Sequence, residues 1–286
     1  MVNCGAALHP RLRRARCAML ALVLAAGAAH AGPWVQKRGH GIVIVGVNAY
    51  RADERFAAFG GGTQPLGPEG KFRSISPHLW AEVGLTDDWT GILSFHAPWQ
   101  RYTQTGYQAS AFAPGDLQAG FRRALRRPDN GWQLAVQVLG KAPTYGADTQ
   151  PRPGNGQGDL ESTLLAGRSF PVGSRWGFFT SEGGFRKRWG RPADQWRGEI
   201  GGGLHATPRL TVMGQAFLTR SVGAFPRVEP GVNPMIEPYY HLVRLQGSVV
   251  TKLGGHWRVQ LGYAQDAAGR NVGRGGQWVL AVWRSF

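Results

Sequence analysis

The sequence predicts an all-β fold: a transmembrane, antiparallel, up-and-down β-barrel of about twelve strands, preceded by a cleaved signal peptide. Three observations lead to this prediction. Polar and apolar residues alternate along many short segments, the connections between these segments alternate in length, and the last segment ends on an aromatic residue. Each signal is weak alone, because a barrel strand is far less conspicuous in a sequence than a membrane helix. Together they indicate a barrel whose outer face meets lipid.

Residues 1–31 have the organisation of a secretory signal peptide. Four arginines between Arg11 and Arg16 precede the apolar run "CAMLALVLAAGAA", and Ala29-His30-Ala31 fits the small-x-small rule for cleavage. We therefore expect a removed segment, 1–31, and a single barrel domain, 32–286. Both cysteines lie in the removed segment, so the exported domain is expected to have no disulfide and no thiol chemistry.

The composition of the chain argues against membrane helices. Hydrophobic residues make up 42% of the sequence and tryptophan occurs 11 times, yet the longest apolar run after the signal, "GIVIVGV", is far shorter than a helical span requires. The net charge of +16 is compatible with nucleic-acid binding, but export argues against such a partner. In an outer membrane, two interpretations stay open: the basic residues meet the phosphates of lipopolysaccharide, or they line a lumen that tolerates anions.

Strict alternation marks the expected strands. In "WQLAVQVLGK", for example, Trp132, Leu134 and Val136 fall on one face, whereas Gln133 and Gln137 fall on the other. A helix would scatter these residues around its surface. The predicted strands are 41–51, 72–84, 89–101, 115–125, 132–142, 158–169, 176–188, 195–206, 210–220, 239–253, 257–265 and 276–286.

The connections between these segments are alternately long and short. "ADERFAAFGGGTQPLGPEG" is followed by "LTDD", and "PTYGADTQPRPGNGQ" is followed by "PVGSR"; the short "GRPADQ" is the exception where a long loop is expected. Outer-membrane barrels have long extracellular loops and short periplasmic turns. The pattern therefore predicts that both chain ends face the periplasm.

Aromatic residues recur at the strand ends. Four short turns are followed at once by tryptophan, and a fifth tryptophan lies ten residues after the first on the same face, which suggests a girdle at each membrane–water interface. The terminal Phe286 is predicted to be part of a signal for the outer-membrane assembly machinery and to close the barrel by pairing the last strand with the first, near Gly41–Arg51. The predicted girdle consists of Trp89, Trp99, Trp132, Trp176 and Trp257.

A family resemblance adds to this picture. The segments "ISPHLWAEVGLTDDW", "PGDLQAGFR", "GQGDLESTLLAGRSF" and "SEGGFRKRWGRPADQWRGEIGGGL", within residues 72–220, resemble the outer-membrane barrels of the MetA-type phenol-degradation pathway, a family described as transporters. These motifs are turns and strand starts and not catalytic signatures. The resemblance implies an outer-membrane barrel and the passage of small, often aromatic, solutes; the first strand and the last third of the chain match less clearly.

Alternation places a set of charged residues inside the expected barrel. Two interpretations compete for them: a packed network of ion pairs that plugs and stabilises the lumen, and a lining that selects the solutes which pass. The opposite assignment would send several of the arginines into lipid, at about 2–4 kcal/mol each near the bilayer midplane. The predicted lumen residues are Glu82, Asp116, Arg122, Asp159, Glu161, Glu182, Arg186, Arg197, Glu199, Arg244 and Arg258.

The sequence points to a channel and away from an enzyme. It contains no metal-ligand spacing, phosphate loop or dinucleotide fingerprint, so we expect no cofactor, no metal and no catalytic residue. The predicted function is a narrow outer-membrane channel for passive passage of small solutes, aromatic or hydrophobic ones included. A structural or interaction barrel with a plugged lumen is the alternative. An outer-membrane lipid hydrolase is the third class; His241 on a strand near the outer rim is its candidate, although the sequence places no serine beside it.

Overall fold

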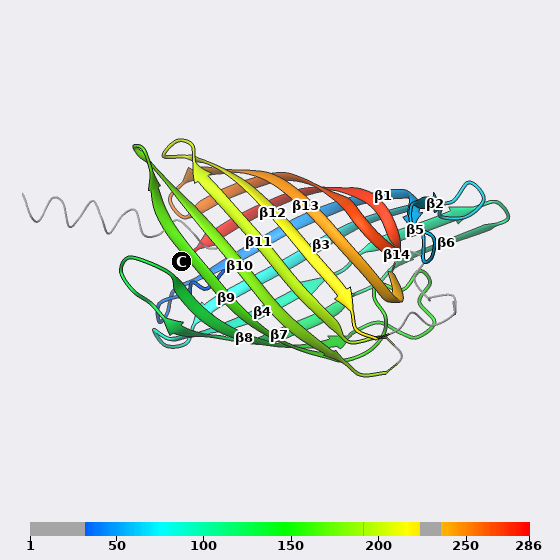
Figure 1. Cartoon of the computed structure of the whole chain (residues 1–286), viewed down its shortest axis with the longest axis horizontal. Coiled ribbons are helices and arrows are strands. Elements are labelled where there is room, and N and C mark those ends of the chain that lie inside the picture. Colours follow the sequence, from blue (N-terminus) through cyan, green and yellow to red (C-terminus); the bar gives the residue numbers. More distant parts are fainter. Residues whose placement is uncertain (1–31, 191, 224–235) are drawn as a thin grey trace, which may run out of the picture. The chain divides into compact units, whose positions relative to one another are not determined.

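Fourteen β-strands, each antiparallel to its neighbours, make up the regular structure of the described chain (Figure 1). The structure is a computed structural model that describes residues 32–190, 192–223 and 236–286, and Gly32–Phe286 form one compact unit. The predicted signal peptide, 1–31, lies outside the described residues. The strands are β1 (Gly41–Phe56), β2 (Thr63–Pro65), β3 (Lys71–Gly84), β4 (Trp89–His96), β5 (Trp99–Gln104), β6 (Tyr107–Phe112), β7 (Asp116–Arg126), β8 (Gln133–Pro143), β9 (Asp159–Val172), β10 (Arg175–Arg188), β11 (Gln195–His205), β12 (Leu210–Ser221), β13 (Ile236–Gly254) and β14 (Trp257–Ser285).

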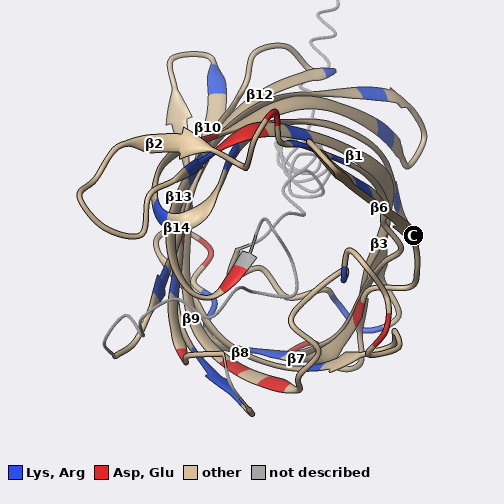
Figure 2. Ribbon diagram, turned by 90° about the vertical axis from the view of Figure 1, so that its right-hand side faces the viewer, with Lys and Arg blue, Asp and Glu red and all other residues tan. Residues whose placement is uncertain are grey.

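The sheet closes on itself. Its order runs from β1 through β14, β13 and the remaining long strands to β3, and β1 also pairs with β3. The strands consequently form a ring when the barrel is seen end-on (Figure 2). Closure leaves no long strand with an unpaired edge, which is the condition for a sheet to stand in lipid. The all-β antiparallel barrel predicted from the sequence is thus confirmed.

Strand β14 folds back on itself. Its first half pairs with β13 and its second half pairs with β1, with Val272 at the change. The rings of Tyr263 and Trp278 lie 5.1 Å apart, and the Ser285 N–H donates to the His256 carbonyl at 3.1 Å, so the two halves lie side by side. The barrel wall therefore contains eleven long strands, or twelve strand segments when the two halves of β14 are counted separately.

Three predicted connections and one predicted strand were wrong in detail. Strand 89–101 is interrupted at Ala97 and Pro98, because proline has no N–H to donate to the ladder. The loop expected after it contains the β5–β6 hairpin, whose turn includes Gly106 at φ 76°. The loop expected after 41–51 instead continues β1 to Phe56 and contains β2, and the loop expected at 266–276 is the tip of the β14 hairpin.

Side chains alternate between the two faces of the wall. On β9, Leu160 and Leu164 are 42% and 64% exposed, whereas Asp159, Glu161 and Thr163 are buried inside. Apolar side chains on the outer face and polar side chains on the inner face suit a wall between lipid and a polar lumen. Within the described ranges, no helix is long and apolar enough to cross a membrane.

A tight seam joins the two ends of the barrel sequence. Gly41 and Phe286 exchange both backbone hydrogen bonds, at 3.0 and 3.1 Å. A Cβ on Gly41 would lie 2.4 Å from the Glu82 carbonyl oxygen and 2.5 Å from the Phe286 ring, so only glycine fits there. From Ile42–Ser285 to Arg51–Gly276 the strands stay in continuous register, as expected for closure near Gly41–Arg51.

Candidate functional site

Buried ion pairs line one arc of the barrel interior, on β7 to β11. Lys141 on β8 begins the network: its ammonium lies 2.8 Å from Asp116 on β7 and 3.2 Å from Asp159 on β9. All three side chains are nearly inaccessible. Acidic and basic stretches accordingly lie next to each other near β7 and β8 in Figure 2.

The same network continues onto β10 and β11. Asp159 lies 3.7 Å from Arg186 and 3.5 Å from Arg188. Glu161, the next inward residue of β9, lies 2.6 Å from Arg186 and 3.0 Å from Arg197 on β11. The ion pairs thus tie five neighbouring strands together at one level. We refer to this set, with Lys141 and Asp116, as the ionic wall.

Arg122 on β7 is a second centre of charge, and only 1% of it is exposed. Its guanidinium lies 3.0 Å from a Glu82 carboxylate oxygen on β3 and donates two hydrogen bonds to Gln137 Oε1 on β8, at 3.1 and 2.9 Å. The remaining nitrogen donates to the Trp34 carbonyl at 3.0 Å. Every side of this buried cation therefore has a partner, as a charge in a lumen wall requires.

The segment before β1, residues 32–38, lies inside the barrel. The Gln36 N–H donates to Thr90 Oγ1 on β4 at 2.8 Å, and its amide nitrogen donates to Glu82 at 3.1 Å. Trp34 contacts the edge of Phe178 on β10, with ring centroids 6.1 Å apart. Because these partners belong to β3, β4, β7 and β10, the segment crosses the interior along that part of the wall. Sequence reasoning missed this segment entirely.

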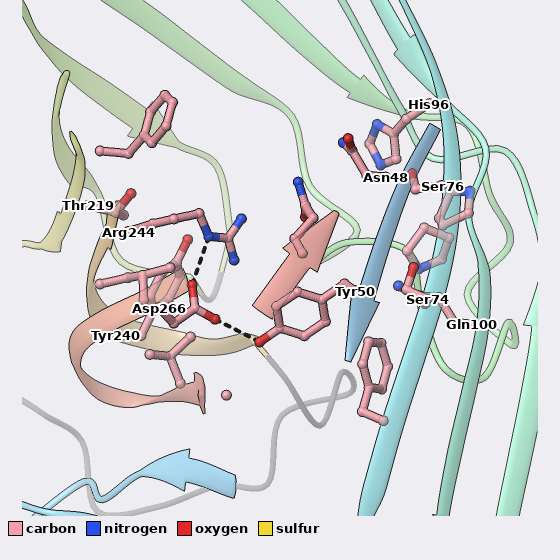
Figure 3. A pocket seen from close by; sticks show the side chains of 18 of the residues that line it. Asn48, Tyr50, Ser74, Ser76, His96, Gln100, Thr219, Tyr240, Arg244 and Asp266 are labelled. Atoms are coloured by element: carbon pink, nitrogen blue, oxygen red, sulfur yellow. Dashed lines mark hydrogen bonds and ion pairs between the residues drawn. The ribbon is translucent and has the colours of Figure 1, made fainter. Parts of the chain in front are cut away.

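A cavity of about 470 Å³ occupies the remaining arc of the lumen, between β1, β3 and β11 to β14 (Figure 3). Its lining combines flat rings with neutral hydrogen-bonding groups. Charged side chains contribute at three positions, Arg197, Arg244 and Asp266. The rings belong to Tyr50, Phe72, His96, Phe217 and Tyr240, and the hydroxyl and amide groups to Asn48, Ser74, Ser76, Gln100, Thr219, Gln246 and Gln277.

Asp266 organises the charged corner of this cavity. Its carboxylate lies 2.7 Å from Arg244 Nε and accepts hydrogen bonds from the Tyr50 hydroxyl at 2.7 Å and the Gly275 N–H at 3.1 Å. The Arg244 guanidinium also lies over the Tyr50 ring, 5.6 Å from its centroid. Figure 3 shows the Arg244–Asp266–Tyr50 contacts reaching from β13 and β14 toward β1. Arg244 keeps 28% of its side chain exposed, so this cation faces the cavity.

The structure separates the predicted lumen residues into groups. One group forms the ionic wall and another surrounds Arg122. Arg244 stands apart from them and pairs with Asp266, and not with Glu199 or Glu182. Those two glutamates face each other in register on β10 and β11, and Glu199 accepts a 2.7 Å hydrogen bond from Gln215. Arg258 donates to Ser285 at 3.0 Å, near the short-turn end of β14.

Asp266 and Tyr50 carry a signal that the sequence reading did not use. Residues Arg258, Gln260, Ala264 and Asp266 share one parity, so extending the alternation by one step would have placed Asp266 inside. It was instead assigned to a loop. The contacts of the 32–38 segment have no comparable pattern, because they depend on tertiary partners.

The aromatic residues of the predicted girdle lie on the outer surface. Trp89, Trp132, Trp176 and Trp257 are all exposed at the short-turn end, and Trp99 is exposed on β5. Two of them carry arginines on their rings: Arg123 lies 5.4 Å from the Trp89 centroid and Arg284 4.9 Å from that of Trp257. An amphipathic ring with a nearby cation suits a membrane–water interface.

His241, the candidate for hydrolase chemistry, lies between two arginines. In the strand register its neighbours are Arg220 on β12 and Arg270 on β14. The hydroxyl of Ser221 is buried and accepts the Tyr240 N–H at 3.1 Å. The register thus gives His241 a cationic neighbour on each side.

Solved outer-membrane proteins share this architecture. The chain is similar to the COG4313 outer membrane channel from Pseudomonas putida F1, with a TM-score of 0.68 and 16% sequence identity over 91% of this chain and 100% of that one. It is also similar to the NanC porin, with a TM-score of 0.51 and 9% identity over 85% of this chain and 100% of that one. No family model and no curated protein sequence matches the chain. At such identities the likeness establishes the fold alone, which is that of outer-membrane β-barrels.

Proposed function

We propose that the protein is an outer-membrane channel through which small solutes pass passively, with the lumen cavity as part of their path. The observation that carries this proposal is the cavity of about 470 Å³ beside a wall of compensated ion pairs. A barrel that served only as a packed anchor would have no need for such a space. Export by a cleaved signal peptide, 1–31, and residence in the outer membrane are parts of the proposal.

The lining favours solutes with a flat or apolar body and a hydrogen-bonding group. The rings of Tyr50, Phe72 and Phe217 offer stacking surface, whereas Ser74 and Gln246 offer neutral donors and acceptors. The resemblance to the MetA-type phenol-degradation barrels supports the same class, small aromatic solutes. Two long loops, 143–157 and 221–238, are proposed to restrict the outer mouth. Pro153 of the first loop lines the cavity, and most of the second loop lies outside the described residues.

Filling the cavity tests the proposal. We expect the purified barrel to conduct ions in planar bilayers and to admit small phenols into liposomes, and Ser76→Trp to lower both several-fold. Ser162→Trp is the matched control, because Ser162 is exposed on the lipid face of β9. If neither the native protein nor a form with shortened loops conducts ions or admits solutes, the channel proposal is wrong.

A plugged structural barrel is the second candidate, and the 32–38 segment favours it. The segment makes hydrogen bonds to Arg122, Glu82 and Thr90 from inside the lumen. Deleting residues 33–37 distinguishes the two functions. A channel should conduct before the deletion and more strongly after it, whereas a plugged barrel should conduct only after it.

Phe286 is proposed to act as an assembly signal as well as a seam residue. Its deletion removes both hydrogen bonds to Gly41 and the exposed terminal ring. We expect outer-membrane levels of the deletion variant to fall much more than its total expression, as measured by surface labelling against whole-cell immunoblots. Normal surface levels would contradict the assembly role.

A further inference from the structure

A groove on the outer wall of the barrel lies over β12, β13 and β14, at the end opposite the short turns. Its volume is about 440 Å³. Leu218, Val243 and Arg220 belong to the outward rows of their strands, because Leu218 is 47% exposed and pairs with Val243. The groove therefore opens on the outer face of the wall, and among its lining residues Leu242 also borders the lumen cavity.

Cationic and imidazole side chains form the upper row of the groove. Arg220, His241 and Arg270 are register neighbours on three adjacent strands. Adjacent strands lie about 4.8 Å apart, so the two arginines start roughly 10 Å from each other. Arginine side chains of this length converge on a ligand placed between them, and the guanidinium fork is matched to phosphate oxygens.

An apolar row lies directly beneath. Leu218, Val243 and Ala268 are also register neighbours, and each lies two positions closer to the middle of the wall on its strand. Gly269 adds no side chain beside them. The groove thus has a basic rim above an apolar floor, which matches a molecule with an anionic head and a hydrocarbon tail.

An aromatic residue marks the level of the basic rim. Arg220 pairs in register with Trp196, which is 56% exposed. The ring centroids of Trp196 and Phe185 lie 5.0 Å apart. Exposed tryptophans gather where a membrane meets water. The rim consequently sits at the level of lipid headgroups on the side that the proposed orientation assigns to the cell exterior.

The eight described residues that line the groove include no aspartate or glutamate. Asp194, close to Trp196 in the chain, already binds the Lys187 ammonium at 2.9 Å and the Arg188 N–H at 2.8 Å. Arg270 is held in place from the other side, because its Nε donates to the Ala58 carbonyl at 2.6 Å and its guanidinium lies over Phe59.

From these observations we infer that the groove binds a phosphorylated, multiply acylated glycolipid of the outer leaflet, of the lipid A type. Arg220 and Arg270 hold the phosphate, His241 lies between them, and one acyl chain lies over Leu218 and Val243. The inference does not depend on conduction through the lumen, since the groove and the cavity lie on different faces of the wall.

Binding of purified lipid A to the full barrel, in a detergent without phosphate, tests the inference by native mass spectrometry. We expect Arg220→Gln/Arg270→Gln to bind about tenfold more weakly than the native protein. Arg284→Gln should bind like the native protein, because Arg284 is an outward arginine at the other end of the barrel, stacked on Trp257. Equal binding by the double variant and the native protein would overturn the site.

Two further measurements separate the ligand sources. Lipid A stripped of its phosphates should bind more weakly, and millimolar inorganic phosphate should fail to displace intact lipid A. If phosphate displaces the lipid completely, the groove is a general anion site and the inference is wrong. Ala268→Trp fills the exposed apolar floor without removing a charge, so it should also weaken lipid A binding; unchanged binding in a folded Ala268→Trp barrel would count against the acyl-chain contact.

Discussion

The two arcs of the barrel interior are built from different chemistry. Across β7 to β11, Lys141, Asp159 and Glu161 belong to a continuous set of ion pairs with little accessible surface. Around the cavity on β1, β13 and β14, the Arg244–Asp266 pair stands among neutral hydroxyls, amides and rings that border an open space. Both arcs face the same lumen, and they differ in whether ion pairs or neutral polar groups make up most of the lining.

This difference indicates that the side chains of one arc are constrained by their ion pairs, whereas those of the other arc can change hydrogen-bond partners. A buried ion is expensive to leave unpaired, so each member of the ionic wall constrains the others. Neutral polar groups around a cavity exchange partners with water or a solute at little cost. The ionic wall is therefore expected to stabilise the barrel, and in the proposed channel the cavity arc is the side that solutes contact.

The largest effect is expected at the centre of the ionic wall. Asp159→Asn removes the carboxylate that faces Lys141, Arg186 and Arg188 and should lower the free energy of unfolding by about 3–5 kcal/mol. Urea unfolding in micelles, followed by tryptophan fluorescence, measures it. Glu54→Gln is the control, because the exposed Glu54–Arg274 pair should contribute under about 1 kcal/mol. Equal losses of unfolding free energy in the two variants would contradict the distinction between the buried ionic wall and an exposed ion pair.

An intermediate effect is expected in the cavity arc. Arg244→Gln removes a largely buried cation that faces the cavity, and Asp266 keeps its hydrogen bonds from Tyr50 and Gly275. The loss of stability should stay at about 1–3 kcal/mol. Reversal potentials in bilayers should show greater selectivity for cations, because the negative charge of Asp266 is no longer neutralised. Glutamate at this position would place two carboxylates together, so glutamine is the cleaner change. An unchanged reversal potential would exclude Arg244 from the conducting path.

The smallest effect is expected outside both arcs, at Asp194. Burial raises its pKa, but the Arg188 N–H and the Lys187 ammonium outweigh burial and hold the pKa below its ordinary value. A carboxyl with a depressed folded-state pKa stabilises the fold above its unfolded pKa and loses this contribution as the pH falls through the folded pKa. Lys187→Gln should therefore flatten the acid limb of the stability profile slightly, by well under about 1 kcal/mol because the site is exposed. A large change in the pH dependence of stability would mean that exposed charges such as Asp194 contribute as much as the ionic wall.

Most of the wall was predictable from the sequence, because alternation is a local property. Leu160 and Asp159 differ by one position and end on opposite faces, as the period of two requires. Partners were less predictable: nothing local pairs Arg244 with Asp266 across a bulge in β14. The 32–38 segment was not predictable at all, since Gln36 and Trp34 reach side chains that only the closed barrel brings near. Hairpin β5–β6 was missed because its polar and aromatic residues also suit a loop.

The seam between Gly41 and Phe286 has a kinetic consequence. Every other neighbouring pair of long strands joins segments close in the chain, whereas the seam joins segments separated by almost the whole barrel sequence. Bringing such distant segments together costs loop entropy before any contact rewards it. The last pairing is thus expected to set the pace of folding, and variants at the seam should slow refolding into lipid vesicles far more than they speed unfolding.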